Sequence, residues 1–388
     1  MGWNGLFARR SEASRSSPPM LALQGGGAHG AFTWGVLDAL LEHDEAAPAA
    51  ATGASAGAIN AVLLAEGLVR AGLRPDRPRR LSAAARDEAR AALAAFWLEL
   101  AEASPFERHA GWLVEGPPDD PRLSPTAQWF MQWAGLLTPE QLDPLDLNPL
   151  RRLITKHIDF ARLRVACPMP LFVAATRLAD SALRVFREHE LGVEVLLASA
   201  CLPRWHRTVE IDGVAYWDGG FSANPPLAPL VFDLPSAVHR GPREVLLVLL
   251  APPKREVIPT GAREIAARQA ELSFAAPLVR EWQWIERLRR EVEQSSRPRW
   301  LRTDLERRLM SLRLHTLDAG DVPALHRTES KMIANRAFVE SLRDAGRAAA
   351  LRWIAGRRAQ SSGASIDSGA DGSVMASSPG NSGASSRS

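Results

Sequence analysis

One serine stands inside a run of five small residues, Gly53-Ala54-Ser55-Ala56-Gly57, which has the spacing G-x-S-x-G. In a tight turn between a strand and a helix, this spacing lifts the serine hydroxyl clear of the backbone, provided that the flanking side chains are nearly absent. All four flanking residues are Gly or Ala, and a helix starting at Ala56 directs the positive end of its dipole toward the hydroxyl. The run predicts a nucleophile at Ser55, although a turn that is tight only for packing reasons has the same pattern.

A second run without bulky side chains is Gly25-Gly26-Gly27-Ala28-His29-Gly30, between the apolar stretch Met20–Gln24 and helical spacing from Ala31. Backbone N–H groups in such a loop turn toward a bound anion. The anion is either a dinucleotide pyrophosphate, because the run also fits G-x-G-x-x-G, or the oxyanion of a tetrahedral ester intermediate. A dinucleotide fold needs an acidic residue after its second strand, whereas here the second strand leads into the serine turn. The oxyanion is therefore favoured.

A serine hydroxyl attacks slowly unless a base removes its proton, and two kinds of base are candidates. One is a histidine late in the chain, but His239 lies in a connector, and His315 and His326 lie in basic sequence expected to be helical. The other is Asp218 in the run Asp218-Gly219-Gly220, directly after the predicted strand Val214–Trp217. An aspartate is a weak base, but oxyanion donors and a helix dipole lower the cost of forming the alkoxide. Asp-Gly is also an ordinary turn pair, so these residues alone leave the choice open.

The elements that must position these residues alternate between strands and helices. Strand patterns cover residues 20–24, 49–52, 171–176, 182–187, 208–211, 214–217 and 245–250. Helical patterns cover residues 31–42, 56–69, 83–102 and 193–199, and the remainder to about Ala355 is also expected to be helical. Residues 104–150, rich in Pro and Trp, indicate an irregular insertion or cap. This order predicts an α/β fold of three αβα layers, with a mostly parallel central sheet and a helical C-terminal region.

Four segments are expected along the chain. Residues 1–18 are rich in Ser and Arg and are predicted to be disordered, and residues 19–235 form the catalytic core. Residues 236–357 hold the remaining sheet strand and a basic helical region packed on the core. Residues 358–388 are rich in Ser and Gly, bury too little apolar area to fold, and are predicted to be disordered.

The net charge of +3 argues against a strong nucleic-acid binder, but the charge is unevenly distributed. From Lys254 to Arg358 there are 22 Lys and Arg against 14 Asp and Glu. This basic face lies either against anionic phospholipid headgroups or in solvent. No apolar run is long enough to span a membrane, and the N-terminus does not resemble a signal peptide, which predicts a cytoplasmic protein, peripheral at a membrane if the lipid alternative holds.

The metal-ligating residue types show no spacing typical of a site. There is no CxxC or HxxxH pattern, so neither a metal site nor a cofactor is expected. The two cysteines, Cys167 and Cys201, are each embedded in apolar or small residues. They are predicted to be separate buried thiols rather than a disulfide.

The three motifs, taken in this order, resemble those of the patatin-like phospholipase family. They are the glycine-rich oxyanion loop at Gly25–Gly30, the G-x-S-x-G at Gly53–Gly57 and the D-G-G at Asp218–Gly220. The resemblance extends to Ser199, to Pro203 and to the run from Tyr216 through Pro225, and it covers residues 20 to about 235. It is looser afterwards, although residues 331–353 look similar to the end of bacterial members.

The resemblance implies a patatin-like fold and phospholipase A-like hydrolysis of lipid carboxylic esters, with phospholipid or another lipid ester as substrate. It implies a Ser–Asp dyad without a catalytic histidine: Ser55 attacks the ester and Asp218 takes its proton. Backbone N–H groups near Gly26 and Gly27, with that of Ala56, would hold the oxyanion. Many members carry Arg or Lys at the position of His29, so a neutral imidazole would supply less positive potential here.

Two other functions stay open from the sequence. One is a conventional esterase or thioesterase that uses a hidden histidine with the same serine. The other is a non-catalytic protein that binds a membrane surface through the basic C-terminal helices.

Overall fold

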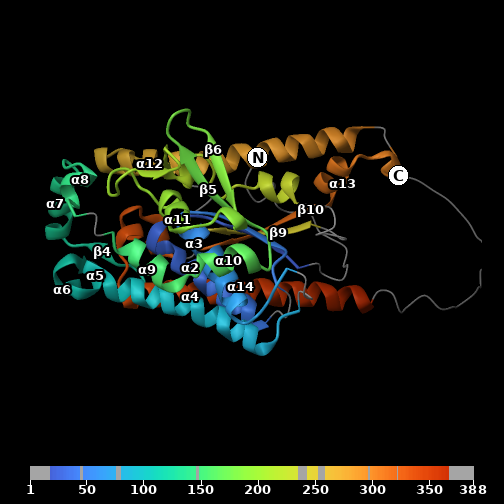
Figure 1. The fold of residues 1–388 in the computed structure, drawn as a ribbon, viewed down its shortest axis with the longest axis horizontal. Helices are drawn as coiled ribbons and strands as arrows, with labels where there is room; N and C mark the ends of the chain where they lie inside the picture. The colour runs from blue at the N-terminus through green and yellow to red at the C-terminus, as the bar shows by residue number, and fades with distance from the viewer. Residues whose placement is uncertain are drawn as a thin grey trace, which may run out of the picture.

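The structure is a computed structural model, which describes residues 18–43, 47–75, 80–145, 148–234, 243–251, 258–295, 298–320 and 322–366. Its centre is an eight-stranded sheet in the order β10-β9-β1-β2-β5-β8-β7, with β6 paired to β5 (Figure 1). The strands are β1 (Met20–Leu23), β2 (Ala50–Ala54), β5 (Leu171–Arg177), β6 (Leu183–Arg187), β7 (Val209–Ile211), β8 (Val214–Asp218), β9 (Arg243–Leu249) and β10 (Leu312–Asp318).

Five adjacent strands, β10, β9, β1, β2 and β5, run parallel, whereas β6 and β8 are antiparallel to β5 and β7 is antiparallel to β8. Four of these strands, β9, β1, β2 and β5, are almost wholly buried, as expected for parallel strands covered on both faces, whereas most of β10 is only partly buried. All four residues of β1 are fully buried. The predicted α/β fold with a mostly parallel sheet is confirmed, and the antiparallel strands make the sheet a mixed one.

Helices cover both faces of the sheet, which completes the three layers (Figure 1). Leu21 and Leu23 of β1 join the core on one face, and Met20 and Ala22 join the core on the other. The first face carries α2 (Gly30–His43), α3 (Ala56–Arg70), α4 (Ala83–Ala103), α9 (Pro149–His157), α10 (Phe160–Ala166), α11 (Val193–Ser199) and α14 (Arg336–Ile366). The second carries the short helix η4 (Pro229–Asp233), α12 (Ala262–Gln294) and α13 (Asp304–Ser311).

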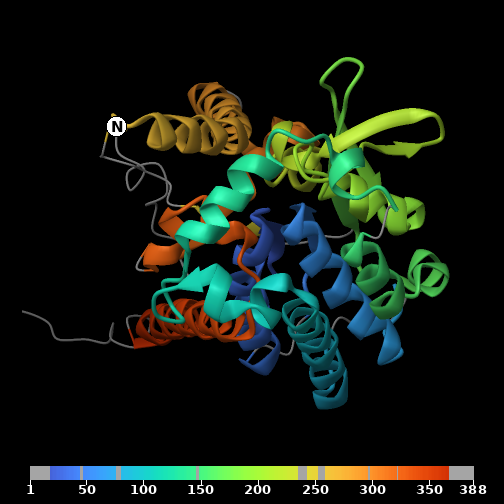
Figure 2. The same cartoon turned by 90° about the vertical axis from the view of Figure 1, so that its left-hand side faces the viewer.

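The segment predicted as an irregular cap is a group of short helices and one short hairpin. Its elements are α5 (Pro105–Arg108), α6 (Ala110–Leu113), β3 (Val114–Glu115), β4 (Arg122–Leu123), α7 (Pro125–Ala134) and α8 (Pro139–Leu142). Several of these helices begin at a proline preceded by a Ser or Thr that caps the first turn, which explains why proline-rich sequence is helical here. Seen end-on, the cap lies across the front of the molecule (Figure 2).

Two predictions about the chain after residue 250 need correction. Residues 312–318 were expected to be helical, but they form β10, which extends the sheet beyond β9. The run LRLHTLD alternates as a strand does, and the arginine-rich sequence around it hides this alternation. Helix α14 continues to Ile366, inside the segment predicted to be a disordered tail. Residues 1–17 and 367–388, and His239 within 235–242, lie outside the described residues.

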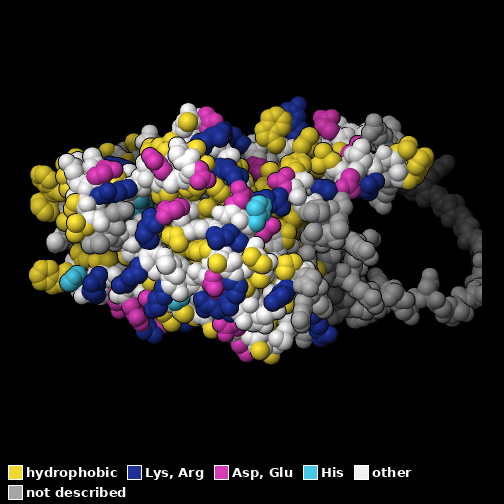
Figure 3. Space-filling model, viewed as in Figure 1, with side chains coloured by type: hydrophobic (Ala, Val, Ile, Leu, Met, Phe, Trp, Pro, Cys, Tyr) yellow, Lys and Arg dark blue, Asp and Glu magenta, His cyan; other side chains and the backbone are white. Residues whose placement is uncertain are grey.

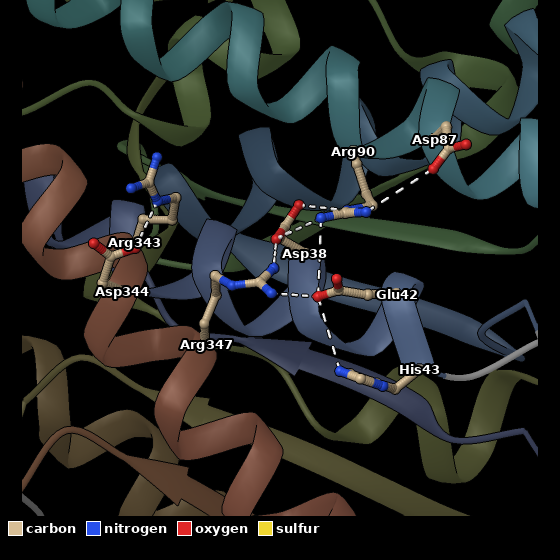
Figure 4. A network of polar contacts seen from close by, with 8 residues as sticks. All are labelled: Asp38, Glu42, His43, Asp87, Arg90, Arg343, Asp344 and Arg347. Carbon is tan, nitrogen blue, oxygen red and sulfur yellow. Dashed lines mark hydrogen bonds and ion pairs between the residues drawn. The ribbon is translucent and has the colours of Figure 1, made fainter.

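Helix α14 lies directly on α2 and also contacts the edge strand β10. A Cβ atom added at Gly35 of α2 or at Gly346 of α14 would overlap a backbone carbonyl of the other helix. Beside this contact, Arg347 of α14 pairs with Asp38 and Glu42 of α2, and Arg90 of α4 reaches the same aspartate at 2.8 Å (Figure 4). The two glycines set the distance between the helices, and the ion pairs lie at the edge of the helix contact.

We expect Gly346→Ala to destabilise the protein by about 1–3 kcal/mol, because the added methyl group forces the two helices apart. Gly356→Ala on the same helix is the matched control: nothing lies within 4 Å of its missing Cβ. That control should be neutral or stabilising by about 0.5–1 kcal/mol, since alanine is the better helix former. Denaturant unfolding of both variants measures the difference, and equal effects would contradict the close α2–α14 contact.

Candidate active site

Ser55 lies at the turn between β2 and α3 in a strained backbone conformation. Its φ is 53° and its ψ is −129°, a region that residues with a side chain rarely adopt. Such strain costs on the order of 1–3 kcal/mol and persists only where the surroundings hold it. Here the Ser55 N–H donates to the carbonyl and to the hydroxyl oxygen of buried Ser199, at 3.1 and 3.0 Å. The turn therefore has the geometry predicted for a nucleophile.

The glycines of the G-x-S-x-G run are required by packing. A Cβ atom at Gly57 would overlap the carbonyl oxygen of Leu23 at the end of β1, and one at Gly53 would lie 2.5 Å from the Ala58 nitrogen. The start of α3 thus lies against the backbone of the neighbouring strand. This contact explains the spacing of the motif in physical terms, and it leaves Ser55 partly accessible at the turn.

The glycine loop lies beside this turn. A Cβ atom at Gly25 would stand 2.7 Å from the Cβ of Ser55, and one at Gly30 would stand 2.7 Å from the Cβ of Ala56. The starts of α2 and α3 are therefore neighbours, and α3 begins directly after the serine. Among the described residues, the N–H groups of Gly26 and Gly27 have no protein hydrogen-bond acceptor. The short helix η1 (Gly27–His29) follows, with Ala28 buried.

Asp218 lies near the serine turn, at the end of β8, which is separated from β2 by β5. In the sheet, Ala54 of β2 is opposite Ala174 of β5, and the next residue of β5, Ala175, is opposite Asp218 of β8. Neighbouring strands are about 4.8 Å apart, so this register brings the ends of β2 and β8 to within about 10 Å of each other. The prediction that the aspartate ends a strand is confirmed.

The Asp218 carboxylate is fully buried, and burial raises its pKa to about 7. A hydrogen bond from the Gly220 N–H to Oδ1 at 2.7 Å opposes this rise, as do the Ser55 hydroxyl and the charge of Lys331. The Ser55 contact falls short of regular hydrogen-bond geometry, since Oδ2 has no partner among the described atoms. The structure thus brings together the two side chains that the sequence singled out, with the carboxylate oriented by its own turn.

The turn Asp218–Gly220, called the acid turn below, is packed tightly against its neighbours. Its two glycines and the nearby Asn224 make the contacts. A Cβ atom at Gly219 would overlap the Ala174 carbonyl oxygen, and one at Gly220 would overlap the ring of Phe274. Asn224 accepts a 2.7 Å hydrogen bond from the Gly25 N–H through Oδ1. That N–H therefore points away from an oxyanion, which leaves Gly26 and Gly27 as the loop's donors. In the sequence, Asn224 stands out only as part of a longer run of similar residues, without this role.

His29 is buried inside the loop and carries no charge near neutral pH. Burial, and then the charge of Lys331, place its pKa well below the ordinary value. Its Nε2 lies 2.8 Å from the hydroxyl of Ser330, which is also fully buried. Sequence reasoning missed Ser330 and Lys331, because they reach the loop from about 300 residues away and belong to no short motif.

The histidines considered as alternative bases are placed elsewhere where they are described. His315 lies on β10, which is separated from β2 by β9 and β1, and its ring contacts Trp353. His326 ends the short helix η7 (Pro323–His326) and contacts the Gly320 carbonyl at 3.2 Å. Among the described residues, no histidine contributes to the pKa shift of Asp218. Cys167 and Cys201 are both buried and unpaired, as predicted.

Similarity to known proteins was found at two levels, a protein family and a solved structure. A protein-family model described as Patatin-like phospholipase matches residues 21–231. The crystal structure of VipD from Legionella pneumophila is similar over 89% of this chain and 70% of that chain, with 14% sequence identity and a TM-score of 0.39. A similarity at that score carries no argument about this chain. No curated protein gives a significant match.

We expect Asp218→Asn to stabilise the protein at pH 8. Because the folded-state pKa of about 7 lies above the unfolded value, the stability contributed by this group is present below about pH 4 and is lost as the pH rises through about 7. Removing the ionisable group should therefore raise the free energy of unfolding by about 2–4 kcal/mol at pH 8 and change it little at pH 3. Thermal unfolding at both pH values measures this.

Asp180→Asn is the matched control, since this exposed carboxyl is paired with Arg177 and its pKa is lowered. It should show no gain at pH 8. A gain for Asp218→Asn that is largest in acid would contradict the burial argument.

Proposed function

The chain belongs to the patatin-like phospholipase family, and we propose that it is a serine lipid acyl hydrolase that cleaves carboxylic esters with Ser55 as nucleophile and Asp218 as base. One observation carries the proposal: a serine on a strained turn shares its surroundings with a buried carboxylate whose pKa is raised to about 7. A base is most effective when its pKa lies near the working pH. Burial gives this aspartate that property, which an exposed one lacks.

Acylation then follows from the positions of the groups. Oγ of Ser55 attacks the ester carbonyl carbon while its proton passes to the Asp218 carboxylate. The carbonyl oxygen becomes an oxyanion, for which the N–H groups of Gly26, Gly27 and Ala56 are the candidate donors. When the intermediate collapses, the C–O bond to the alcohol breaks, and the alcohol takes the proton from Asp218.

Deacylation repeats these steps with water as the nucleophile. Asp218 takes a proton from the water as its oxygen attacks the acyl-serine carbonyl, and the oxyanion forms at the same donors. Collapse breaks the bond to Oγ, and the proton on Asp218 returns to Ser55. The fatty acid leaves and the dyad is restored without a histidine.

We expect Ser55→Ala and Asp218→Asn each to lower kcat/KM on a short p-nitrophenyl ester by at least about 1000-fold, because nucleophile and base act as one unit. The same variants should abolish fatty-acid release from phospholipid vesicles. Ser222→Ala in the acid turn is the matched control and should stay within about twofold of wild type. Equal rates in all four proteins would refute the hydrolase assignment.

The two other functions give distinct results in the same experiments. A conventional esterase or thioesterase would lose acylation on substitution of His239, His315 or His326. A non-catalytic surface protein would bind vesicles while a fluorophosphonate probe leaves Ser55 unlabelled. Our proposal requires labelling of wild type, no labelling of Ser55→Ala, and retention of labelling in the three histidine variants.

We also propose that the cap forms the contact with a lipid surface. Residues 123–138, which include α7, carry no charged side chain, and Trp129, Phe130 and Trp133 are 62%, 61% and 56% exposed. Trp112 of α6 and Leu136 add to this surface, which forms the left-hand end of the molecule in Figure 3. Aromatic side chains favour the boundary between water and lipid. None of the described helices is long and apolar enough to cross a membrane.

The basic C-terminal segment fits the lipid-contact role less well than the sequence indicated. Many of its arginines are used in ion pairs within the protein. These pairs include Arg268–Glu271, Arg289–Glu286, Arg308–Asp304, Arg327–Asp120, Arg347–Asp38 and Arg357–Glu244. The rings of Trp129 and Trp133, in contrast, contact each other at 5.8 Å between centroids and stay mostly exposed.

We expect the double substitution Trp129→Ser and Trp133→Ser to lower hydrolysis of phospholipid vesicles by about tenfold, since it removes much of the apolar contact area. Hydrolysis of the soluble ester should stay within about twofold of wild type. Trp300→Ser is the matched control: this tryptophan is 78% exposed and lies in η6 (Arg299–Leu301), shortly before α13. Equal losses on vesicles and soluble ester, or an equal loss in the control, would contradict a lipid-binding cap.

A further inference from the structure

The glycine loop contains no charged group, although its proposed task is to hold a developing negative charge. Residues 25–30 include one titratable side chain, His29, and burial keeps that imidazole neutral. A preorganised positive charge beside an oxyanion is among the largest contributions to catalysis. Any such charge must therefore come from another part of the chain.

The backbone of a residue with a positively charged side chain, Lys331, reaches the loop from the short helix η8 (Glu329–Met332). The Cβ atom that Gly27 lacks would lie 2.5 Å from the carbonyl oxygen of Lys331 and 3.6 Å from its Cβ. Gly27 also has a φ of 60°, which glycine adopts most easily. A glycine at this position thus lets the backbone of Lys331 lie directly on the loop, and the lysine side chain starts from that contact.

Several contacts fix η8 in this place. The buried hydroxyl of Ser330 lies 2.8 Å from His29 Nε2 and also reaches the carbonyls of Ala324 and Arg327, at 2.6 and 2.9 Å. Arg327 pairs with Asp120 of the cap, and the Thr328 hydroxyl lies 3.2 Å from a carboxylate oxygen of α12. His29 therefore serves as an anchor that joins the loop to η8, rather than as a charge.

The charge of Lys331 acts on both titratable groups of the site. It lowers the pKa of His29 and the pKa of Asp218. Around the Asp218 carboxylate, the Gly220 N–H and the Ser55 hydroxyl also favour the ionised form, and burial opposes it. The Cys201 thiol faces the carboxylate as well, but its pKa is raised to about 12 and it stays neutral. Among the groups named here that act on the Asp218 carboxylate, Lys331 is the cation.

We propose that Lys331 is a positioning residue of the active site. Held on the glycine loop by the His29–Ser330 contact, its ammonium group supplies the positive charge that keeps Asp218 ionised and stabilises the oxyanion formed beside the loop. The inference rests on the proposed hydrolase function. It adds to the site a residue that lies 100 positions beyond the end of the matched family region at residue 231.

Activity against pH tests the proposal. Wild-type kcat/KM on a soluble p-nitrophenyl ester should rise with pH through about 7, because Asp218 must be ionised to act as base. In Lys331→Met this rise should move to higher pH by roughly half a unit or more, and the plateau should fall about tenfold. Lys331→Arg should restore most of the wild-type pH dependence and most of the plateau activity. The exposed Lys156, paired with Glu99, gives the matched control Lys156→Met, which should behave as wild type.

An unchanged pH profile and plateau in Lys331→Met would overturn the proposal, as would an equal loss in Lys331→Arg, which would indicate packing rather than charge.

A second measurement separates this inference from the proposed function. The difference in unfolding free energy between wild type and Asp218→Asn, followed against pH, reports the folded-state pKa of Asp218 without any activity. Its midpoint should move to higher pH in the Lys331→Met background, and a fixed midpoint would refute the proposal. If the midpoint moves but Ser55→Ala is as active as wild type, the charge coupling stands and the hydrolase assignment falls.

Discussion

The site depends on one packing constraint: segments of backbone meet around Ser55 with no room for a Cβ atom between them. Gly57 lies on the carbonyl of Leu23, Gly25 lies on Ser55 itself, and Gly219 lies on the backbone of β5. These contacts fix the spacing between the first strand, the serine turn and the acid turn. Because interiors are close-packed, the surroundings can hold Ser55 in a conformation that it would not adopt alone. The small residues of the motifs are thus structural requirements of the geometry, and the chemistry follows from the side chains that they position.

The second determinant is the balance of forces on one buried carboxylate. Full burial alone would leave Asp218 protonated and useless as a base at neutral pH, whereas full exposure would leave it too weakly basic. The Gly220 N–H, the Ser55 hydroxyl and the Lys331 charge moderate the effect of burial, so that the pKa comes to about 7. Such an arrangement destabilises the folded state around the site, as is common where activity requires an unfavourable environment.

Local patterns gave most of the fold and the centre of the site. The helices from Gly30 and Ala56 and the hairpin across Asp212-Gly213 follow from spacing and turn chemistry, and both turn residues have the positive φ that such a turn requires. The features that the sequence did not predict depend on contacts between distant residues, or their pattern is hidden by the local composition. β10 is hidden in arginine-rich sequence, and Ser330 and Lys331 join the glycine loop only through tertiary packing. The role of His29 also depends on Ser330, which no pattern around residue 29 reveals.

The pairing of α2 with α14 has a consequence for how the chain folds as it is made. Helix α2 (Gly30–His43) emerges early, but its partner α14 begins at Arg336. At about 5–20 residues per second, a ribosome needs roughly 15–60 s to synthesise the intervening stretch. Throughout that interval, the apolar surface of α2 that α14 later covers has no permanent cover. The growing chain therefore exposes apolar side chains of α2 for tens of seconds before their partner helix is made.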